Sequence, residues 1–203
     1  MLVELKSTRQ VDRRPQILDA AERCFALNGF HKTTMQDIAR EAGMVPGNLY
    51  RYFPSKNAII AGLVERDRAE IAADFATLSN AENLMAAFEQ LGRKHFIDQP
   101  HMKAVIALQI WSEAALDPEI AAHVSAVQSE VRNGIRNVLS RARDTGEIHQ
   151  DVEVEALTHL IITLSDGMIR RRAMDVDFHS QGEIENNLCI IGAVLSGAIR
   201  FSQ

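Results

Sequence analysis

Apolar residues recur at helical spacing along almost the whole chain, and this periodicity limits the fold more than any other feature. Near the C-terminal end, for example, Ile184, Leu188, Ile191, Leu195 and Ile199 are spaced to fall on one side of a helix. No segment alternates apolar and polar residues long enough to predict a strand. With 46% hydrophobic residues in 203, the chain can bury a core. We therefore expect an all-α protein of about nine helices.

Turn and capping residues divide the first part of the chain into short helices. Gly43 predicts the end of a second helix that begins at Thr33 or Thr34, where Thr33 and Gln36 can form a capping box. Pro46 is favoured in the first turn of a third helix, and Ser55 can cap a long fourth one. The expected helices cover residues 14–28, 34–42, 46–53 and 55–78.

The remaining helices predict a larger body. Asp117 and Pro118 are typical of a helix start, and Gly146 of a helix end. The expected body helices cover roughly residues 82–97, 101–116, 118–144, 153–173 and 183–201. We place the domain boundary after residue 54, with a head of residues 1–54 and a body of residues 55–203.

The stretch DIAREAGMVPGNLYRYFPSK, Asp37 to Lys56, contains two short helices joined by a glycine turn. Such a pair, after a supporting helix, is typical of a helix-turn-helix unit, whose second helix lies in the major groove of DNA. Leu49 and Phe53 are one helical turn apart and are expected to face inward. The outward positions are Gly47, Asn48, Arg51 and, in part, Tyr50 and Tyr52.

These outward side chains suit a polyanion. Asn48 can pair with a base edge, and Arg51 can read a guanine or bind a phosphate. Tyrosine hydroxyls donate to phosphate oxygens, and Lys56 lies in the first turn of a helix, another phosphate-binding position. Residues 1–56 carry nine Lys or Arg against six Asp or Glu, whereas residues 57–203 carry thirteen against twenty-one, which favours an anionic partner at the head. The alternative is a surface helical hairpin whose tyrosines cover the core.

The segments TTMQDIAREAG and GNLYRYFPSKNAII resemble the DNA-binding head of the TetR (tetracycline repressor) family of bacterial regulators, over about residues 14–62. The body segments DTGEIHQDVEVEAL and LSDGM are also similar to that family. The chain departs from the family at Val45, where a serine is frequent. The resemblance implies phosphate contacts from Thr34, Tyr50, Tyr52 and Lys56, and positions near base edges for Gly47, Asn48 and Arg51.

The last two predicted helices are apolar on more than one side, which predicts burial on more than one side. The resemblance implies that they form a four-helix interface between two identical chains, and pairing would let two heads read two half-sites. The expected interface residues are Leu157, Leu164, Leu188, Ile191, Ala193 and Leu195. The alternative is that both are internal core helices. The consecutive arginines at 170–172 are interpreted as cations favoured near a helix C-terminus, the alternative being a second nucleic-acid patch.

Between these regions the body contains apolar and aromatic residues with a few polar ones, a composition that also fits an ordinary core. The family resemblance implies a pocket here for a small-molecule effector. Its expected residues are Phe88, His95, Phe96, Met102, Trp111 and Met168. A ligand that prefers one arrangement of the body would change the separation of two heads and so release DNA.

Several classes of protein are disfavoured. Cys24 and Cys189 are far apart in sequence and predict neither a disulfide framework nor a metal site, and the seven histidines lack metal-ligand spacing. There is no phosphate-binding glycine loop and no nucleophile–base pair, so we predict neither a cofactor nor enzyme activity. The opening MLVELKSTRQVDRRPQ does not predict a secretory signal, and residues 188–199 are too few to span a bilayer. We expect a cytoplasmic protein.

The function predicted from these features is that of a homodimeric repressor, released from a two-fold symmetric operator by a small-molecule effector. The alternative is a DNA-binding activator, or a regulator controlled by a partner and lacking an effector. A helical enzyme with a chance likeness to a DNA-binding head is the remaining possibility, and no motif favours it.

Overall fold

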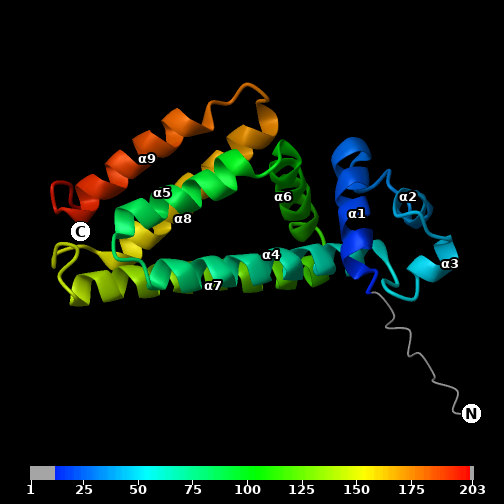
Figure 1. Cartoon of the computed structure of the whole chain (residues 1–203), viewed down its shortest axis with the longest axis horizontal. Helices are drawn as coiled ribbons and strands as arrows, with labels where there is room; N and C mark the ends of the chain where they lie inside the picture. Colours follow the sequence, from blue (N-terminus) through cyan, green and yellow to red (C-terminus); the bar gives the residue numbers. More distant parts are fainter. Residues whose placement is uncertain (1–11, 202–203) are drawn as a thin grey trace, which may run out of the picture. The chain divides into compact units, whose positions relative to one another are not determined.

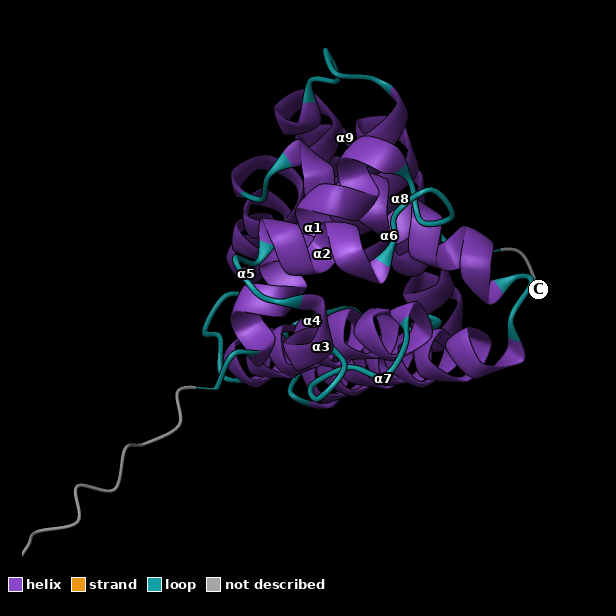
Figure 2. Cartoon of the chain, turned by 90° about the vertical axis from the view of Figure 1, so that its right-hand side faces the viewer, coloured by secondary structure: helices purple, strands orange, loops and turns teal. Residues whose placement is uncertain are grey.

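A computed structural model describes residues 12–201, which form nine α-helices and one short π-helix (Figure 1). These residues contain helices and loops only (Figure 2), which confirms the predicted all-α class. Residues 1–11, on which most of the signal-peptide prediction falls, lie outside the described part. The chain divides into two compact units, the first ending at Ile59 and the second beginning at Ile60.

The first unit is built on α1 (Arg14–Asn28), α2 (Met35–Glu41), α3 (Pro46–Leu49) and the first residues of α4 (Lys56–Ser79). Its core is formed by fully buried side chains, among them Ile17, Ile38 and Leu49. Gly43, between α2 and α3, has a φ of 64°, a left-handed conformation that residues with a Cβ rarely adopt. Glycine at this position therefore allows the tight turn between the two short helices.

Two neighbouring threonines define the start of α2. The Thr34 hydroxyl accepts a bond from Asp37 N at 3.1 Å, and the Asp37 carboxylate accepts one from Thr34 N at 2.9 Å. The capping box therefore joins Thr34 to Asp37, and the predicted Thr33–Gln36 box is wrong. The Thr33 hydroxyl is buried and donates to the carbonyls of Cys24 and Gly29. Its burial there leaves Thr34 as the cap.

Replacing Thr34 with alanine is expected to destabilise the first unit by about 1 kcal/mol, because the backbone N–H of Asp37 loses its acceptor. Hydrogen exchange of the α2 amides measures this change. Gln36→Ala, on the same helix but outside the box, is the matched control and should change exchange little. Equal effects of the two substitutions would contradict the assignment.

The second unit contains the rest of α4 together with α5 (Leu84–Arg93), η1 (Lys94–Asp98), α6 (His101–Ala114), α7 (Pro118–Asp144), α8 (Val154–Met174) and α9 (Ser180–Leu195). In Figure 1, α4 and α7 run along one edge of this unit, α5 and α8 along another, and α6 across the end between them. Arg68 on α4 and Glu130 on α7 form an ion pair, and this guanidinium lowers the pKa of Glu130.

Three helices differ from their predicted lengths. The third ends at Leu49, and Tyr50 to Phe53 continue as hydrogen-bonded turns up to Pro54, which disfavours helical backbone at Phe53. The segment predicted as one helix over 82–97 is divided into α5 and the π-helix η1. The final helix ends at Leu195, since Gly197 turns the chain with a φ of 75° and His149 N donates to Leu195 O.

Candidate nucleic-acid interface and ligand cavity

A ridge of exposed groups lies on α3 and the turn that follows it. We define the recognition ridge as Gly47, Asn48, Tyr50 and Arg51. All four are exposed, with Tyr50 at 51%. Beneath them Leu49 is 0% exposed and anchors this short helix in the core of the first unit. The ridge therefore consists of three polar side chains and one glycine above a buried leucine.

Contacts from α1 hold the base of the recognition ridge. The Gln16 side chain donates from Nε2 to Ala42 O at 2.7 Å, which fixes the end of α2. The Arg14 guanidinium lies 5.7 Å from the centre of the Phe53 ring, and Phe53 is buried as predicted. These bonds place α3 without using Asn48 or Arg51. Both side chains are thus available to a ligand of the first unit.

A hollow of about 360 Å³ lies beside the ridge. Its lining contains Arg13, Gly43, Met44, Val45, Asn48, Arg51 and Tyr52. Arg13 was not predicted as a site residue, although the adjacent arginines at the start of α1, Arg13 and Arg14, are a visible signal of positive charge. The hollow places a second guanidinium near Arg51, so the surface offers two cations to a polyanion.

Two of the predicted phosphate-contacting residues already have partners in the first unit. The Thr34 hydroxyl donates to the Asp37 carboxylate at 2.6 Å. Lys56 Nζ donates to Phe30 O at 2.8 Å and lies 4.4 Å from the Phe30 ring centre. Both residues thus hold the turn before α2 in place. Their contact with phosphate stays a prediction.

Val45 stands where the family that the chain resembles frequently has a serine, and the structure shows the consequence. Val45 is the residue before the first turn of α3, is 68% exposed and gives no side-chain cap. Pro46 follows it, and a proline at this position removes one of the unpaired N–H groups and presets the helical φ. The helix thus begins without the hydroxyl that a serine would supply.

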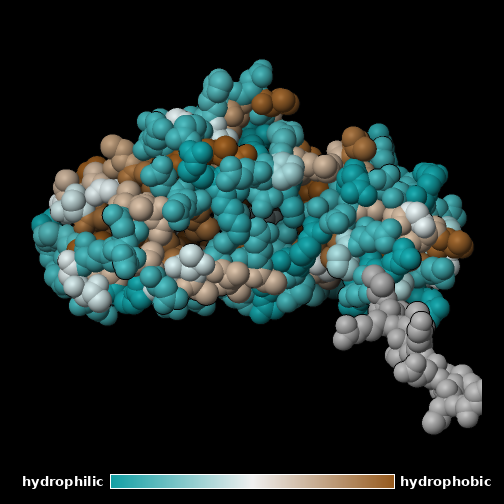
Figure 3. Space-filling model, viewed as in Figure 1, coloured by the Kyte–Doolittle hydropathy of each residue, from teal (hydrophilic) through white to brown (hydrophobic). Residues whose placement is uncertain are grey.

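The second unit contains a cavity of about 540 Å³, within the range of small-molecule sites. Its lining includes five of the six predicted pocket residues: Phe88, His95, Phe96, Trp111 and Met168. Met102 is not among the lining residues. On α6 the lining runs through Lys103, Ala107 and Trp111, one helical turn apart, and Met102 lies off that face. In the space-filling view, apolar side chains in brown lie recessed among hydrophilic ones over the second unit (Figure 3).

The α4 wall of this cavity carries ion pairs. Asp74 accepts bonds from Lys94 Nζ at 2.6 Å and His95 Nε2 at 2.7 Å. Lys94 also lies 3.1 Å from Glu70, and these carboxylates raise the pKa of Lys94 despite its partial burial. Lys103 on α6 pairs with Asp67 on α4 at 3.1 Å. Cations from η1 and α6 therefore partner the acidic face of α4.

The predicted dimer-interface residues have different surroundings. Leu157, Ile191 and Leu195 are buried in the core of their own chain, and Leu157 is 0% exposed, which leaves little of these side chains for a partner. Leu164 and Leu188 line the cavity. Ala193 is half-buried on α9. The interface role of these six leucine, isoleucine and alanine residues stays a prediction.

Other positions on α9 face outward. Cys189 is exposed and Ile190 is 43% exposed, and both lie close to Ala193 on the helix surface. We define the α9 face as Asn186, Cys189, Ile190 and Ala193. The sequence showed that this helix is apolar on more than one side. It did not show which side packs against the core of its own chain.

Residues 17–63 match the family described as bacterial regulatory proteins of the tetR family, and residues 80–186 match the C-terminal region of BetI-type transcriptional repressors. The chain belongs to the TetR family. It is a DNA-binding transcriptional regulator, which agrees with the predicted family and with the prediction that it is not an enzyme.

Relatives of this TetR-family chain are similar along most of their length. The transcriptional repressor AcnR of Corynebacterium efficiens is 27% identical over 176 residues, covering 87% of this chain and 90% of AcnR. GusR of Salmonella enterica has the same fold, with a TM-score of 0.77 at 24% identity over 94% of this chain and 98% of GusR. FadR of Bacillus subtilis, solved with stearoyl-CoA, has a TM-score of 0.75 at 21% identity, covering 92% of this chain and 99% of FadR.

Within residues 12–201, no helix combines the length and the apolar character needed to cross a bilayer.

Cys24 and Cys189 are both free thiols. Burial raises the pKa of the Cys24 thiol, with nearby Glu41 contributing in the same direction.

Proposed function

We propose that this regulator is a homodimeric repressor that binds a two-fold symmetric operator and leaves it when a small molecule occupies the cavity of the second unit. The observation that carries the proposal is the recognition ridge, in which Asn48 and Arg51 are exposed while Leu49 beneath them is fully buried. An asparagine on a short helix and an arginine in the turn directly after it are suited to base edges in the major groove.

The cavity supports the second part of the proposal. α4 begins in the first unit, a few residues after the recognition ridge, and supplies part of the cavity wall in the second. A ligand that binds one position of α4 better than another shifts the population toward that position. The relative from Bacillus subtilis, whose fold is shared, was solved with a small molecule, stearoyl-CoA. Repression is supported by the name of the Corynebacterium relative, a transcriptional repressor.

Selection of bound duplexes from a random DNA library tests the operator prediction. The expected product is a site of two inverted half-sites about one helical turn apart, because one short helix reads too few base pairs alone. Enrichment of a single asymmetric half-site, or no enrichment, would contradict it. The selected duplex can then be used to screen small molecules for release, and failure of every molecule would favour a regulator without an effector.

Pairing of two chains is proposed through α8 and the α9 face. Replacing Ile190 with arginine is expected to raise the dimer dissociation constant by roughly 100-fold, because a charge would be buried without a partner. Light scattering across a concentration series measures the shift from dimer to monomer. Leu116→Arg is the matched control, since Leu116 is 78% exposed and lies after α6. A monomeric wild-type protein, or dimers in both variants, would contradict this interface.

A further inference from the structure

Three consecutive arginines near the end of α8 have three different environments. Arg170 is exposed and has only the Met174 sulfur as a partner, at 3.8 Å. Arg171 pairs with Glu183 of α9 at 2.7 Å. Arg172 is half-buried and lines the cavity, on the same face of α8 as Ile161 and Met168, which are buried. Helix-end electrostatics alone therefore does not explain the third arginine.

Arg172 binds the main chain of η1. Its Nη1 donates to His95 O at 3.1 Å, and its Nη2 donates to Gln99 O. Carbonyls at a helix end lack partners within the helix, so these bonds account for the position of the guanidinium. They use two of its five N–H groups, and a carbonyl carries no net charge. The charge of Arg172 thus remains uncompensated, with further donors free.

No carboxylate among residues 12–201 lies within ion-pair distance of Arg172. Burial lowers the pKa of this guanidinium. A half-buried cation without an anion is unfavourable, and an anionic ligand would relieve that cost. Arg172 is therefore suited to bind a charged group that enters the cavity.

The other charged residues that line the cavity differ in whether they have an ion-pair partner. Asp67, Glu70 and Asp74 on α4 have lysine or histidine partners. Asp166 on α8 is exposed by its surface area and has no ion-pair partner within the described residues, and desolvation raises its pKa. Arg132 on α7, at the exposed margin of the cavity, is a second cation without a partner there. In the described part of the chain, Arg132 and Arg172 are thus the cations of the lining that have no carboxylate partner, and Asp166 is its carboxylate without a cationic partner.

We propose that the cavity binds an amphipathic anion, with a carboxylate or phosphate head against Arg172 and an apolar body among Phe88, Phe96 and Trp111. A guanidinium offers paired N–H donors that match either head group. The aromatic side chains and the adjoining aliphatic ones supply the apolar surface that the body of the ligand needs. This inference rests on the proposed effector function of the cavity.

Trp111 makes the test direct, because it is the only tryptophan of the chain and it lines the cavity. Its fluorescence is followed while the full-length protein is titrated with dodecanoate, dodecyl phosphate, dodecanol or dodecylamine, all below their micelle concentrations. At least one of the two anions is expected to bind about ten-fold or more tightly than the alcohol and the amine. Comparison of the two anions distinguishes a carboxylate from a phosphate ligand. Tighter binding of the amine or the alcohol would overturn the proposal.

Variants assign the effect to Arg172. Arg172→Gln is expected to reduce anion affinity about ten-fold, to that of the alcohol, while alcohol binding stays unchanged. Arg170→Gln, the matched control on the exposed side of α8, should leave all four affinities unchanged. Unchanged anion binding in Arg172→Gln would overturn the assignment.

If Arg172→Gln disturbs the structure of the cavity, dodecanol will also bind more weakly to this variant. Arg172→Lys, which keeps the charge, then decides: it should retain a preference for the anion, and absence of any preference would overturn the proposal. The proposed function is judged separately by operator release. If the amine or an uncharged ligand releases the DNA, the effector function stands and only the anion proposal fails.

Discussion

Replacing Arg51 with alanine is expected to lower the affinity for the selected operator by about ten-fold for each half-site, or roughly 100-fold for a dimer that uses two. Arg51 is exposed on the recognition ridge and has no role in holding α3, whose support comes from Leu49 and Phe53. The fold should therefore be unaffected. Fluorescence anisotropy of the labelled duplex measures the affinity, and circular dichroism checks that helix content is retained.

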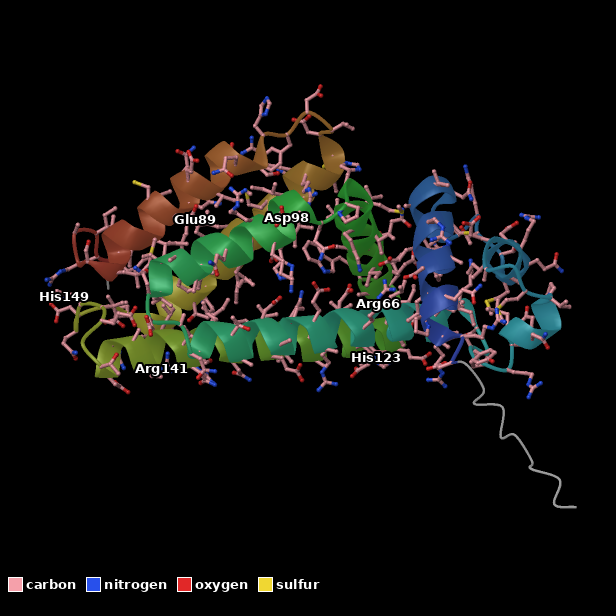
Figure 4. The ribbon with its side chains drawn as sticks, in the orientation of Figure 1. Arg66, Glu89, Asp98, His123, Arg141 and His149 are labelled. Atoms are coloured by element: carbon pink, nitrogen blue, oxygen red, sulfur yellow. The ribbon has the colours of Figure 1, made fainter. Side chains whose placement is uncertain are left out.

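The matched control for this prediction is Arg141→Ala. Arg141 is an exposed arginine of α7, in the second unit, where Figure 4 labels it, and it belongs neither to the recognition ridge nor to the hollow beside it. Arg141→Ala removes the same charge as Arg51→Ala, and the operator affinity of this variant should stay within about two-fold of the wild-type value. If both substitutions weaken binding equally, the effect would come from net charge, and the recognition role of Arg51 would be wrong.

Replacing Leu49 with alanine is expected to destabilise the first unit by about 2 to 5 kcal/mol. Leu49 is 0% exposed, so the truncation leaves a cavity under a helix of only four residues. Hydrogen exchange of residues 35–53 measures local stability without assuming that both units unfold together. Operator binding should fall with it, because the recognition ridge loses its support.

Val45→Ala is the matched control for Leu49→Ala. Val45 is apolar but 68% exposed, immediately before the same helix, and its truncation should change stability by less than about 0.5 kcal/mol. Unchanged protection in Leu49→Ala, or equal loss in both variants, would show that α3 is not anchored by its buried leucine.

The head was largely predictable because its signals are local. Gly43, Pro46 and the pair Leu49 and Phe53 define the turn, the helix start and the buried side through backbone conformation and helical spacing alone. The cap of α2 was assigned to the wrong residue because Thr33 and Thr34 have the same capping chemistry. Only the buried bonds from Thr33 to the end of α1 and the turn after it distinguish them.

The body was less predictable because its site depends on how separate helices pack. Periodicity identified Trp111 and Met102 as apolar residues of one helix, but not which of them faces the cavity. Leu157 and Leu195 fit an interface as well as a core by spacing, and the structure places both in the core. Likewise, nothing in three adjacent arginines indicates that Arg172 alone lines the cavity.

The most direct measurement of the central claim is operator affinity as a function of salt for the wild-type protein. If the recognition ridge and its neighbouring cations neutralise DNA phosphates, the association constant should fall by about 1,000-fold or more between roughly 50 and 200 mM salt. The decline should be linear on logarithmic axes. An affinity that stays constant over this range would show that the exposed face of α3 does not bind duplex DNA.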